Sequence, residues 1–279
     1  MRARKRFGQN FLQDQQVIQR ILASINPQPG DHILEIGPGH GALTRGLIAS
    51  GCRLTVVEID RDLAAELRLQ YPGLNVIESD ILKFDFQSLD SDRPVRVVGN
   101  LPYNISTPLL FRLFEHIELI QDMYFMLQLE VVERMVAPHS TSNYGRLSIM
   151  SQHYCETYKL FDVAPDAFIP QPKITSAILQ LIPHTEPTQV DDLALFQALV
   201  TRAFSQRRKT LRNALKPYLT EVEMQTLDIP STQRPETISG AQYIQCANYL
   251  SARGEPASEV SVPAQSALPD SPDSPDELS

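Results

Sequence analysis

Residues 32–41 read HILEIGPGHG, a short apolar run that leads directly into three glycines. The run His32–Ile36 has the length and composition of a buried strand. Glycines at the end of such a strand allow the backbone to approach a ligand, and ligands of doubly wound α/β proteins bind at this carboxyl edge of the sheet. The stretch therefore predicts the first strand of a ligand-binding α/β sheet.

Short apolar runs and helical stretches alternate after this motif. The predicted strands cover residues 54–58, 75–79, 95–99 and 123–128, and the predicted helices cover residues 42–49, 63–69, 107–116 and 130–136. Alternation of this kind indicates a parallel sheet with helices on both faces. A helix over residues 12–25, capped by Asp14, is predicted before the first strand, and residues 176–182 are predicted as a late strand at an antiparallel edge.

The C-terminal third of the chain has a different pattern. Residues 183–187 contain two prolines and have the composition of a linker. Only helical patterns follow, over residues 191–204, 209–218 and 241–252. The last 25 residues hold five prolines and six acidic residues, a composition that cannot bury enough apolar surface to fold. We therefore predict a first domain over residues 1–184, a helical domain over 188–253 and a disordered acidic tail over 254–279.

The formal net charge of −8 argues against a nucleic-acid partner until its distribution is considered. Six acidic residues and no basic one lie in the last 25 positions, so the rest of the chain carries −2. Two basic clusters are candidates for RNA contacts, because local patches rather than net charge determine affinity for phosphate. They comprise Arg4, Lys5 and Arg6 near the start, and Arg207, Arg208, Lys209 and Arg212, in a predicted basic helix over residues 202–216, near the end. The second cluster lies in the helical domain over 188–253, which we therefore predict to bind RNA. The alternative is that both clusters are solvated surface.

Other features exclude whole classes of protein. No apolar run is long enough to span a bilayer, so we expect no membrane partner. The three cysteines, Cys52, Cys155 and Cys246, are odd in number and far apart, which favours a reducing compartment and a cytoplasmic location. No histidine has metal-ligand spacing with them, so no metal site is expected. Nothing indicates an obligate dimer, and we expect a monomer.

Each of the first four predicted strands ends on a glycine or a polar side chain, namely Gly37, Glu58, Asp80 and Asn100. Because the carboxyl ends of parallel strands meet at one edge, we expect these residues to line one crevice. Glu58 can accept hydrogen bonds from both hydroxyls of a ribose, and Asp80 from an adenine amino group. The glycines also fit a loose dinucleotide fingerprint, so a dehydrogenase is an alternative.

The segment Asn100-Leu-Pro-Tyr103 is typical of enzymes that methylate amino groups of nucleobases. The N6 lone pair of adenine is delocalised into the ring and is a poor nucleophile. Acceptors at the Asn100 side chain and the Pro102 carbonyl would localise this lone pair and stabilise the positive charge that develops on N6. We expect Tyr103 to stack on a flipped-out base and Phe168, in a proline-rich loop, to form the opposite wall. The alternatives are a plain turn and a buried core phenylalanine.

Five motifs together resemble those of the ribosomal RNA adenine dimethyltransferases. They are Arg4-Lys-Arg-Phe-Gly-Gln-Asn-Phe-Leu12, Glu35-Ile-Gly-Pro-Gly39, Asn100-Leu-Pro-Tyr-Asn-Ile-Ser106, Phe168-x-Pro-x-Pro-Lys173 and Phe204-x-Gln-Arg-Arg-Lys-Thr-Leu-Arg-Asn213. The resemblance covers residues 3 to about 252 and is greatest to the bacterial small-subunit branch. It implies a Rossmann-like class I methyltransferase sheet with helices on both faces, a small all-helical C-terminal domain, and S-adenosylmethionine as cofactor.

The same resemblance implies a substrate and further cofactor contacts. Members dimethylate N6 of two adjacent adenosines in a hairpin loop near the 3′ end of 16S rRNA, within a small-subunit particle, and serve small-subunit biogenesis. The resemblance adds Asn10 and Leu12 to the cofactor site and assigns Gly37, Glu58, Asp80 and Asn100 to it.

Two alternatives stay open at this point. One is the related large-subunit enzyme that confers macrolide resistance, although Leu101 and the Asn-Ile-Ser-Thr107 continuation favour the small-subunit branch. The other is an RNA-binding assembly factor with secondary catalysis, against which the intact Asn100 motif argues. The sequence does not indicate which assembly intermediate is the substrate or the order of the methylations.

Overall fold

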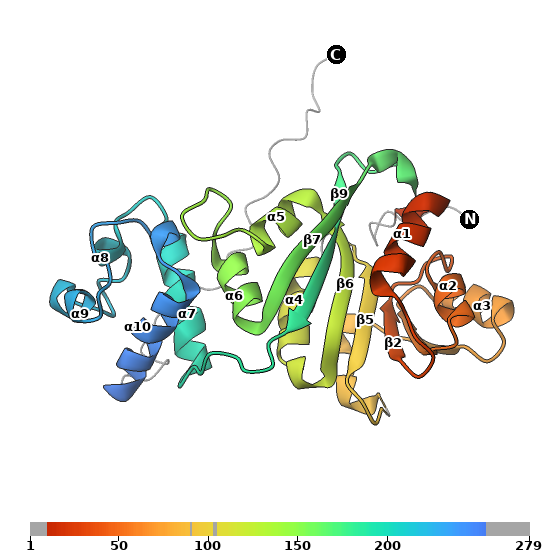
Figure 1. The fold of residues 1–279 in the computed structure, drawn as a ribbon, viewed down its shortest axis with the longest axis horizontal. Coiled ribbons are helices and arrows are strands. Elements are labelled where there is room, and N and C mark those ends of the chain that lie inside the picture. Colours follow the sequence, from red (N-terminus) through yellow and green to blue (C-terminus); the bar gives the residue numbers. More distant parts are fainter. Residues whose placement is uncertain (1–9, 90, 103–104, 255–279) are drawn as a thin grey trace, which may run out of the picture. The chain divides into compact units, whose positions relative to one another are not determined.

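The computed structural model describes residues 10–89, 91–102 and 105–254 (Figure 1). Contacts divide the chain into two units, which we call the sheet domain and the helical domain. The sheet domain comprises residues 1–138 and 147–187, and the helical domain comprises residues 139–146 and 188–279. The short segment 139–146 therefore packs with the C-terminal helices, whereas the sequence analysis kept it in the first domain. The predicted tail from residue 255 on, Tyr103 and the cluster Arg4–Arg6 lie outside the described residues.

The sheet domain is built on seven strands in the order β4-β3-β2-β5-β6-β9-β7 (Figure 1). Their bounds are β2 (His32–Ile36), β3 (Arg53–Glu58), β4 (Asn75–Glu78), β5 (Val95–Asn100), β6 (Ile120–Gln128), β7 (Cys155–Val163) and β9 (Ser176–Pro183). The first five are parallel, with β2 in the centre, as the alternation of strands and helices predicted. The central strands β2 and β5 are mostly apolar and almost entirely buried, as is usual in a parallel sheet.

The predicted late strand is antiparallel, but it is not at an edge. β9 lies between β6 and β7 and pairs antiparallel with both, so β7 forms the edge instead. No strand was predicted over β7, because its residues, Cys-Glu-Thr-Tyr-Lys-Leu-Phe-Asp-Val163, mix charges with apolar side chains. A polar outer strand with a register shift between Lys159 and Phe161 is a common way to protect a sheet edge from pairing with another chain.

Helices of the sheet domain flank the sheet on both faces. They are α1 (Gln15–Ile25), α2 (Thr44–Ala49), α3 (Arg61–Gln70), α4 (Ser106–Phe114), α5 (Leu129–Met135) and α6 (Arg146–Tyr154). The predicted helix over 12–25 begins later, at Gln15, because Asp14 is its cap and accepts the amides of Gln16 and Val17 at 2.8 and 3.0 Å. Residues Phe11–Leu12 instead form a short strand, β1.

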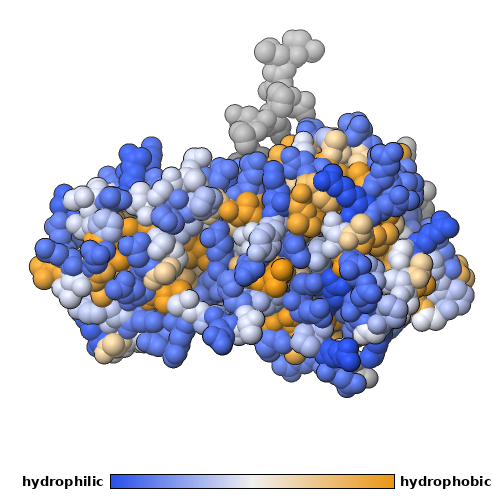
Figure 2. Space-filling view, in the orientation of Figure 1, coloured by the Kyte–Doolittle hydropathy of each residue, from blue (hydrophilic) through white to orange (hydrophobic). Residues whose placement is uncertain are grey.

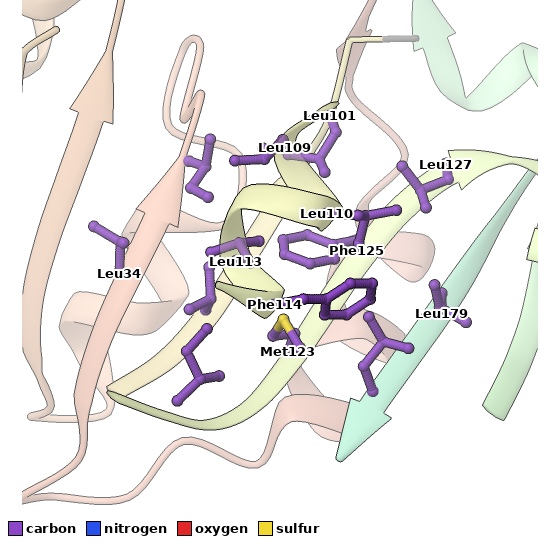
Figure 3. Packing of buried hydrophobic residues seen from close by; sticks show 14 of the residues in the cluster. Leu34, Leu101, Leu109, Leu110, Leu113, Phe114, Met123, Phe125, Leu127 and Leu179 are labelled. Carbon is purple, nitrogen blue, oxygen red and sulfur yellow. The ribbon is translucent and has the colours of Figure 1, made fainter. Parts of the chain in front are cut away.

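Strand side chains alternate between two apolar layers, as the period of a strand requires. On one face Leu34 of β2 and Phe125 of β6 belong to a cluster with Leu110 of α4, and Figure 3 shows the α4 leucines directed at the strands. On the other face Ile33 of β2 packs in a cluster with Ile21 of α1. Each fully buried side chain of this size contributes roughly 1.5–3 kcal/mol to folding.

The helical domain contains α7 (Leu193–Ser205), α8 (Leu211–Ala214), α9 (Glu221–Thr226) and α10 (Gly240–Ala252). Helices α7 and α10 match the predictions, with Asp192 and Ser239 as their caps. The predicted helix over 209–218 is wrong: only residues 211–214 are helical, and turns surround them. Thr220 starts α9 with a capping box, a signal that the sequence analysis did not use.

Figure 2 shows hydrophilic residues over most of the visible face, with hydrophobic residues in small groups between them. Isolated apolar residues on a surface are ordinary and mark no interface by themselves. Among the described residues, no helix is both long and apolar enough to cross a membrane.

Candidate active site

The carboxyl ends of four parallel strands meet at one edge of the sheet. Ile36 of β2 pairs with Val57 of β3 on one side and with Gly99 of β5 on the other, and Glu58 pairs with Glu78 of β4. The register therefore brings the residues just after these positions to the same edge. This is where the binding crevice of a doubly wound sheet lies.

A cavity of about 250 Å³ opens at this edge. Its lining includes all the described residues that were predicted to bind a cofactor or the target base. They are Asn10, Leu12, Gly37, Glu58, Asp80, Asn100, Pro102 and Phe168. Tyr103 is outside the described residues. The sequence thus predicted residues that are distant along the chain and close in space.

The glycine loop after β2 adopts a backbone that only glycine takes readily. Gly37 and Gly39 have φ values of +62° and +59°. A side chain at Gly39 would also lie 3.0 Å from the ring of Phe11, closer than normal packing allows. The loop therefore needs glycine for its turn and for close contact with the N-terminal segment.

Glu58, at the end of the neighbouring strand β3, holds this loop by hydrogen bonds. One carboxylate oxygen accepts the Gly39 amide at 3.2 Å, and the other accepts the Asp60 amide at 2.8 Å. The residue is 3 % exposed, and burial raises the pKa of its carboxyl while the two amides counteract that rise. The Ile59 amide also acts on this carboxylate, which has about four acceptor positions, so acceptor capacity remains for a ligand hydroxyl.

Glu35 is a second buried acid in the cavity, and the sequence analysis gave it no role. It accepts the hydroxyl of Thr44 at 2.6 Å. Burial raises its pKa from 4.5 to about 7, and the nearby charge of Glu58 adds to that rise. The sequence contained a signal for Glu35, because an acid inside an otherwise apolar buried strand requires a compensating partner.

Asp80 follows β4 and caps a short turn. One of its oxygens accepts the amide of Leu82 at 3.0 Å, and the residue lines the cavity. The other oxygen has no hydrogen bond among those described for this residue, so an acceptor is available for a ligand amino group.

Asn100 ends β5 with a fixed side-chain orientation. Its amide nitrogen donates to the backbone carbonyl of Asn10 at 3.0 Å. Because a carbonyl only accepts, this bond assigns the nitrogen to Asn10 and turns the amide oxygen away from it. The Pro102 carbonyl already accepts the Ile105 amide at 3.1 Å and retains one further acceptor position.

Gly99 allows β5 to come this close to β2. A side chain at Gly99 would lie 2.7 Å from the carbonyl oxygen of Ile36, within the sheet, and 3.1 Å from Leu101. Leu101 itself is 1 % exposed and belongs to the core cluster that contains α4 (Figure 3). The residue that separated the two enzyme branches in the sequence analysis is thus largely a packing residue.

The N-terminal segment reaches the site through a two-stranded pairing. In β1, Phe11 pairs with Ile169 and Leu12 with Phe168 of β8 (Phe168–Ile169). Phe168 is 3 % exposed and packs in the same apolar cluster as Leu12. Both interpretations of Phe168 therefore have support, because the residue is a core phenylalanine that also lines the cavity.

Comparison with known proteins identifies the family of proteins that has these features. A model of the family described as ribosomal RNA adenine dimethylase matches residues 1–252. The chain belongs to this family. The match confirms the predicted family, the class I methyltransferase fold and S-adenosylmethionine as the cofactor.

Curated relatives of this dimethylase extend over nearly its whole length. The ribosomal RNA small subunit methyltransferase A of Marinobacter nauticus is 52% identical and covers 91% of this chain and 93% of the relative. The protein of the same name from Pseudomonas aeruginosa is 52% identical and covers 89% and 95%.

Two solved structures are also similar to this dimethylase. A dimethyladenosine transferase from Plasmodium falciparum has a TM-score of 0.75 and 25% identity, covering 88% of this chain and 98% of that one. The 23S rRNA methyltransferase ErmE has a TM-score of 0.68 and 25% identity, covering 87% and 100%.

The cavity of this dimethylase fits the adenosyl group of the cofactor. Glu58 presents a buried carboxylate beside the glycine loop. The glycines of this loop have no side chain that would cover the backbone. Ile59 and Leu82 add apolar walls to the lining, and Asp80 adds an acceptor. Acceptors for hydroxyl and amino groups between apolar walls are what a nucleoside requires.

The basic cluster of the helical domain divides into engaged and free side chains. The predicted basic helix over 202–216 is wrong, because residues 206–210 form a turn between α7 and α8. Arg207 donates to the Ser142 carbonyl and lies 3.8 Å from Glu236, and Arg212 lies 3.3 Å from Glu221. Arg208 and Lys209 are exposed, and no interaction with another described residue engages their side chains.

Proposed function

We propose that this dimethylase transfers two methyl groups to N6 of each of two adjacent adenosines, in a hairpin loop near the 3′ end of 16S small-subunit rRNA. The observation that carries the proposal is the orientation of Asn100 at the cavity, set by its bond to Asn10. This bond leaves the Asn100 amide oxygen as an acceptor beside a pocket suited to an adenosyl group.

The proposed chemistry depends on two acceptors. In the first transfer, the Asn100 side-chain oxygen and the Pro102 carbonyl each accept one N6–H bond of the target adenine. Together they localise the nitrogen lone pair and stabilise the positive charge that develops on N6 during methyl transfer. Pro102 has an acceptor position for this purpose, because the Ile105 amide uses only one of its two. The proton is lost readily once nitrogen is alkylated, so no strong base is required.

The cofactor-binding residues in this proposal are Asn10, Leu12, Gly37, Glu58, Asp80 and Asn100. Bound S-adenosylmethionine supplies the electrophilic methyl group. Glu58 accepts the two ribose hydroxyls, and Asp80 accepts the adenine amino group. Asn10 and Leu12 close over the methionine part. Holding both reactants in one alignment contributes much of the rate.

Two aromatic residues complete the proposed base site. Tyr103 stacks on the flipped-out adenine, and Phe168 forms the facing wall. Only a small part of Phe168 is exposed, so its contact with the base is limited to the part of the ring that lines the cavity. Its packing against Leu12 supports a rigid wall.

RNA affinity in this proposal comes from two basic clusters, Arg4–Arg6 and residues 207–212. Within the second cluster Arg208 and Lys209 carry the phosphate contacts, since Arg207 and Arg212 are held by their own domain. The small-subunit target is favoured over the large-subunit one by relatives above 50% identity that carry the small-subunit name, against 25% for ErmE. The substrate is a pre-ribosomal particle. The enzyme acts on it in the cytoplasm and as a monomer.

The test is to locate the methylated nucleotides. Small-subunit particles that lack this modification are incubated with the full chain and labelled S-adenosylmethionine, and the modified positions are mapped by reverse transcription and mass spectrometry. We expect N6,N6-dimethyladenosine at two adjacent positions of one hairpin loop. Modification of large-subunit rRNA instead would support the macrolide-resistance alternative, and RNA binding without methylation would support an assembly factor.

A further inference from the structure

The ring of Phe11 rests on the glycine loop rather than in the core. It lies against the backbone of Gly39, where a side chain would meet it at 3.0 Å, and it packs on the imidazole of His40. The ring centroids of Phe11 and His40 are 4.4 Å apart and the planes are tilted by 53°. Both residues line the cavity, and neither was predicted to belong to the site.

His40 is held in turn by helix α3. Its Nδ1 lies 3.3 Å from a carboxylate oxygen of Glu66. Because an ionised carboxylate only accepts, Nδ1 carries the proton in this contact. The imidazole is therefore oriented from one side by Glu66 and covered on the other by Phe11.

The segment that carries Phe11 is anchored in the core by Leu12, which is 7 % exposed, and the Gln13 amide after it donates to the Ala167 carbonyl at 2.8 Å. We call residues 10–12 the strap. Its ladder to β8 is two residues long, and the Asn100 amide joins it at the Asn10 carbonyl. So short a ladder gives little stability of its own, so the side chains of the strap, Leu12 in the core and Phe11 on His40, contribute to holding it in place.

We propose that His40 is a positioning residue that clamps Phe11 and thereby holds the strap over the cofactor pocket. The inference rests on the proposed function, in which this pocket binds S-adenosylmethionine. His40 acts through Phe11 and touches neither the target base nor the reacting atoms. Loss of the clamp loosens the strap, so the cofactor leaves more readily and the Asn100 amide loses part of the hold that Asn10 gives it.

The expected effects separate this role from a general structural one. Removing a ring contact of this kind corresponds to a change of about two- to tenfold in an equilibrium constant. We expect His40→Ala to raise the dissociation constant of the cofactor and its KM by such a factor, with a smaller change in kcat. His40→Phe, which keeps a ring on Phe11, restores most of the affinity.

The experiment titrates the full chain with S-adenosylhomocysteine by calorimetry and measures KM and kcat for S-adenosylmethionine. The variants are His40→Ala, His40→Phe, Phe11→Ala and the double variant His40→Ala/Phe11→Ala. The matched control is His116→Ala, which removes an imidazole 5.3 Å from the ring of Phe86 and outside the cavity lining. Hydrogen exchange of the amides of Phe11 and Leu12 reports on the strap directly.

The proposal is supported if the double variant binds no more weakly than Phe11→Ala and if exchange in the strap rises in His40→Ala but not in His116→Ala. Additive losses in the double variant would overturn it, as would unchanged affinity in His40→Ala or a loss that His40→Phe does not restore. Failure of the unaltered chain to bind S-adenosylhomocysteine would instead overturn the assignment of the pocket, and this inference with it.

Discussion

The side-chain nitrogen of Asn100 donates to the backbone carbonyl of Asn10 at 3.0 Å, across 90 residues of sequence. This bond joins the end of the central strand β5 to the strap at the N-terminus. It orients the Asn100 amide, so that its oxygen is the atom left for a substrate. The predicted catalytic residue and a predicted cofactor residue thus form one unit.

The first prediction concerns this unit. Asn100→Ala is expected to lower kcat about 10²- to 10³-fold, the usual cost of removing one preorganised acceptor or donor from a reacting centre. Affinity for RNA should change little, and single-turnover rates with saturating RNA provide the measurement. Asn75→Ala is a suitable control because Asn75 also bonds through its side-chain nitrogen, to Thr55, at the opposite end of a strand. Weakened RNA binding with an unchanged bound-state rate would contradict the role of Asn100.

The second prediction tests the close approach of β5 and β2. Gly99→Ala places a methyl group 2.7 Å from the Ile36 carbonyl oxygen, and the sheet must shift to accommodate it. We expect the free energy of unfolding to fall by about 1–3 kcal/mol and activity to fall with it. Urea denaturation provides the measurement. Gly145→Ala, whose new methyl would meet only ordinary contacts at 3.9 Å and beyond, should change stability by less than about 0.5 kcal/mol.

The third prediction separates the free cations from the engaged ones. Arg208→Gln with Lys209→Gln should weaken RNA binding and reduce the slope of log affinity against log salt by about 1 for each phosphate that the protein no longer neutralises. Arg207→Gln should act mainly on stability, because Arg207 contacts Ser142 and Glu236 within the helical domain. Filter binding over a range of salt concentrations distinguishes the two. An unchanged slope in the first variant would show that Arg208 and Lys209 are solvated surface residues that contact no phosphate.

The fourth prediction is a dependence of stability on pH. Burial raises the pKa of Glu35 from 4.5 to about 7, so the folded state binds a proton more tightly than the unfolded state. Its contribution is therefore fully favourable below about pH 4.5 and is lost as the pH rises to about 7. Glu35→Gln keeps an acceptor for the Thr44 hydroxyl and should lessen this fall by up to about 3 kcal/mol.

Unfolding of the unaltered chain and of Glu35→Gln is compared at pH 5 and pH 8 without cofactor. Glu58, whose pKa is also raised, is present in both proteins, so the difference between them reports Glu35 together with its coupling to Glu58. Identical pH dependence in the two proteins would show that Glu35 is ionised at little cost in the folded state.

The sequence by itself determined the central part of the fold and predicted most of the residues that line the candidate site. The alternation of strands and helices indicated a parallel sheet, and each of its first four strand ends carried a usable signal, such as the glycines after Ile36 or Asn100 at the end of β5. These signals are local, because a strand period and a glycine turn depend on neighbouring residues. Parallel strands then necessarily bring their carboxyl ends to one edge.

Only the tertiary structure decided which side chains act together. The strand β7, the contact of Phe11 with His40, and the division of the basic cluster into engaged and free cations depend on residues that are distant in sequence. No local sequence pattern predicts that the Glu66 carboxylate contacts the His40 imidazole. The same is true of the hydrogen bond from Arg207 to the Ser142 carbonyl. Such pairings follow from packing, in which the position of one element determines the partners of another, and they give Asn100 its orientation.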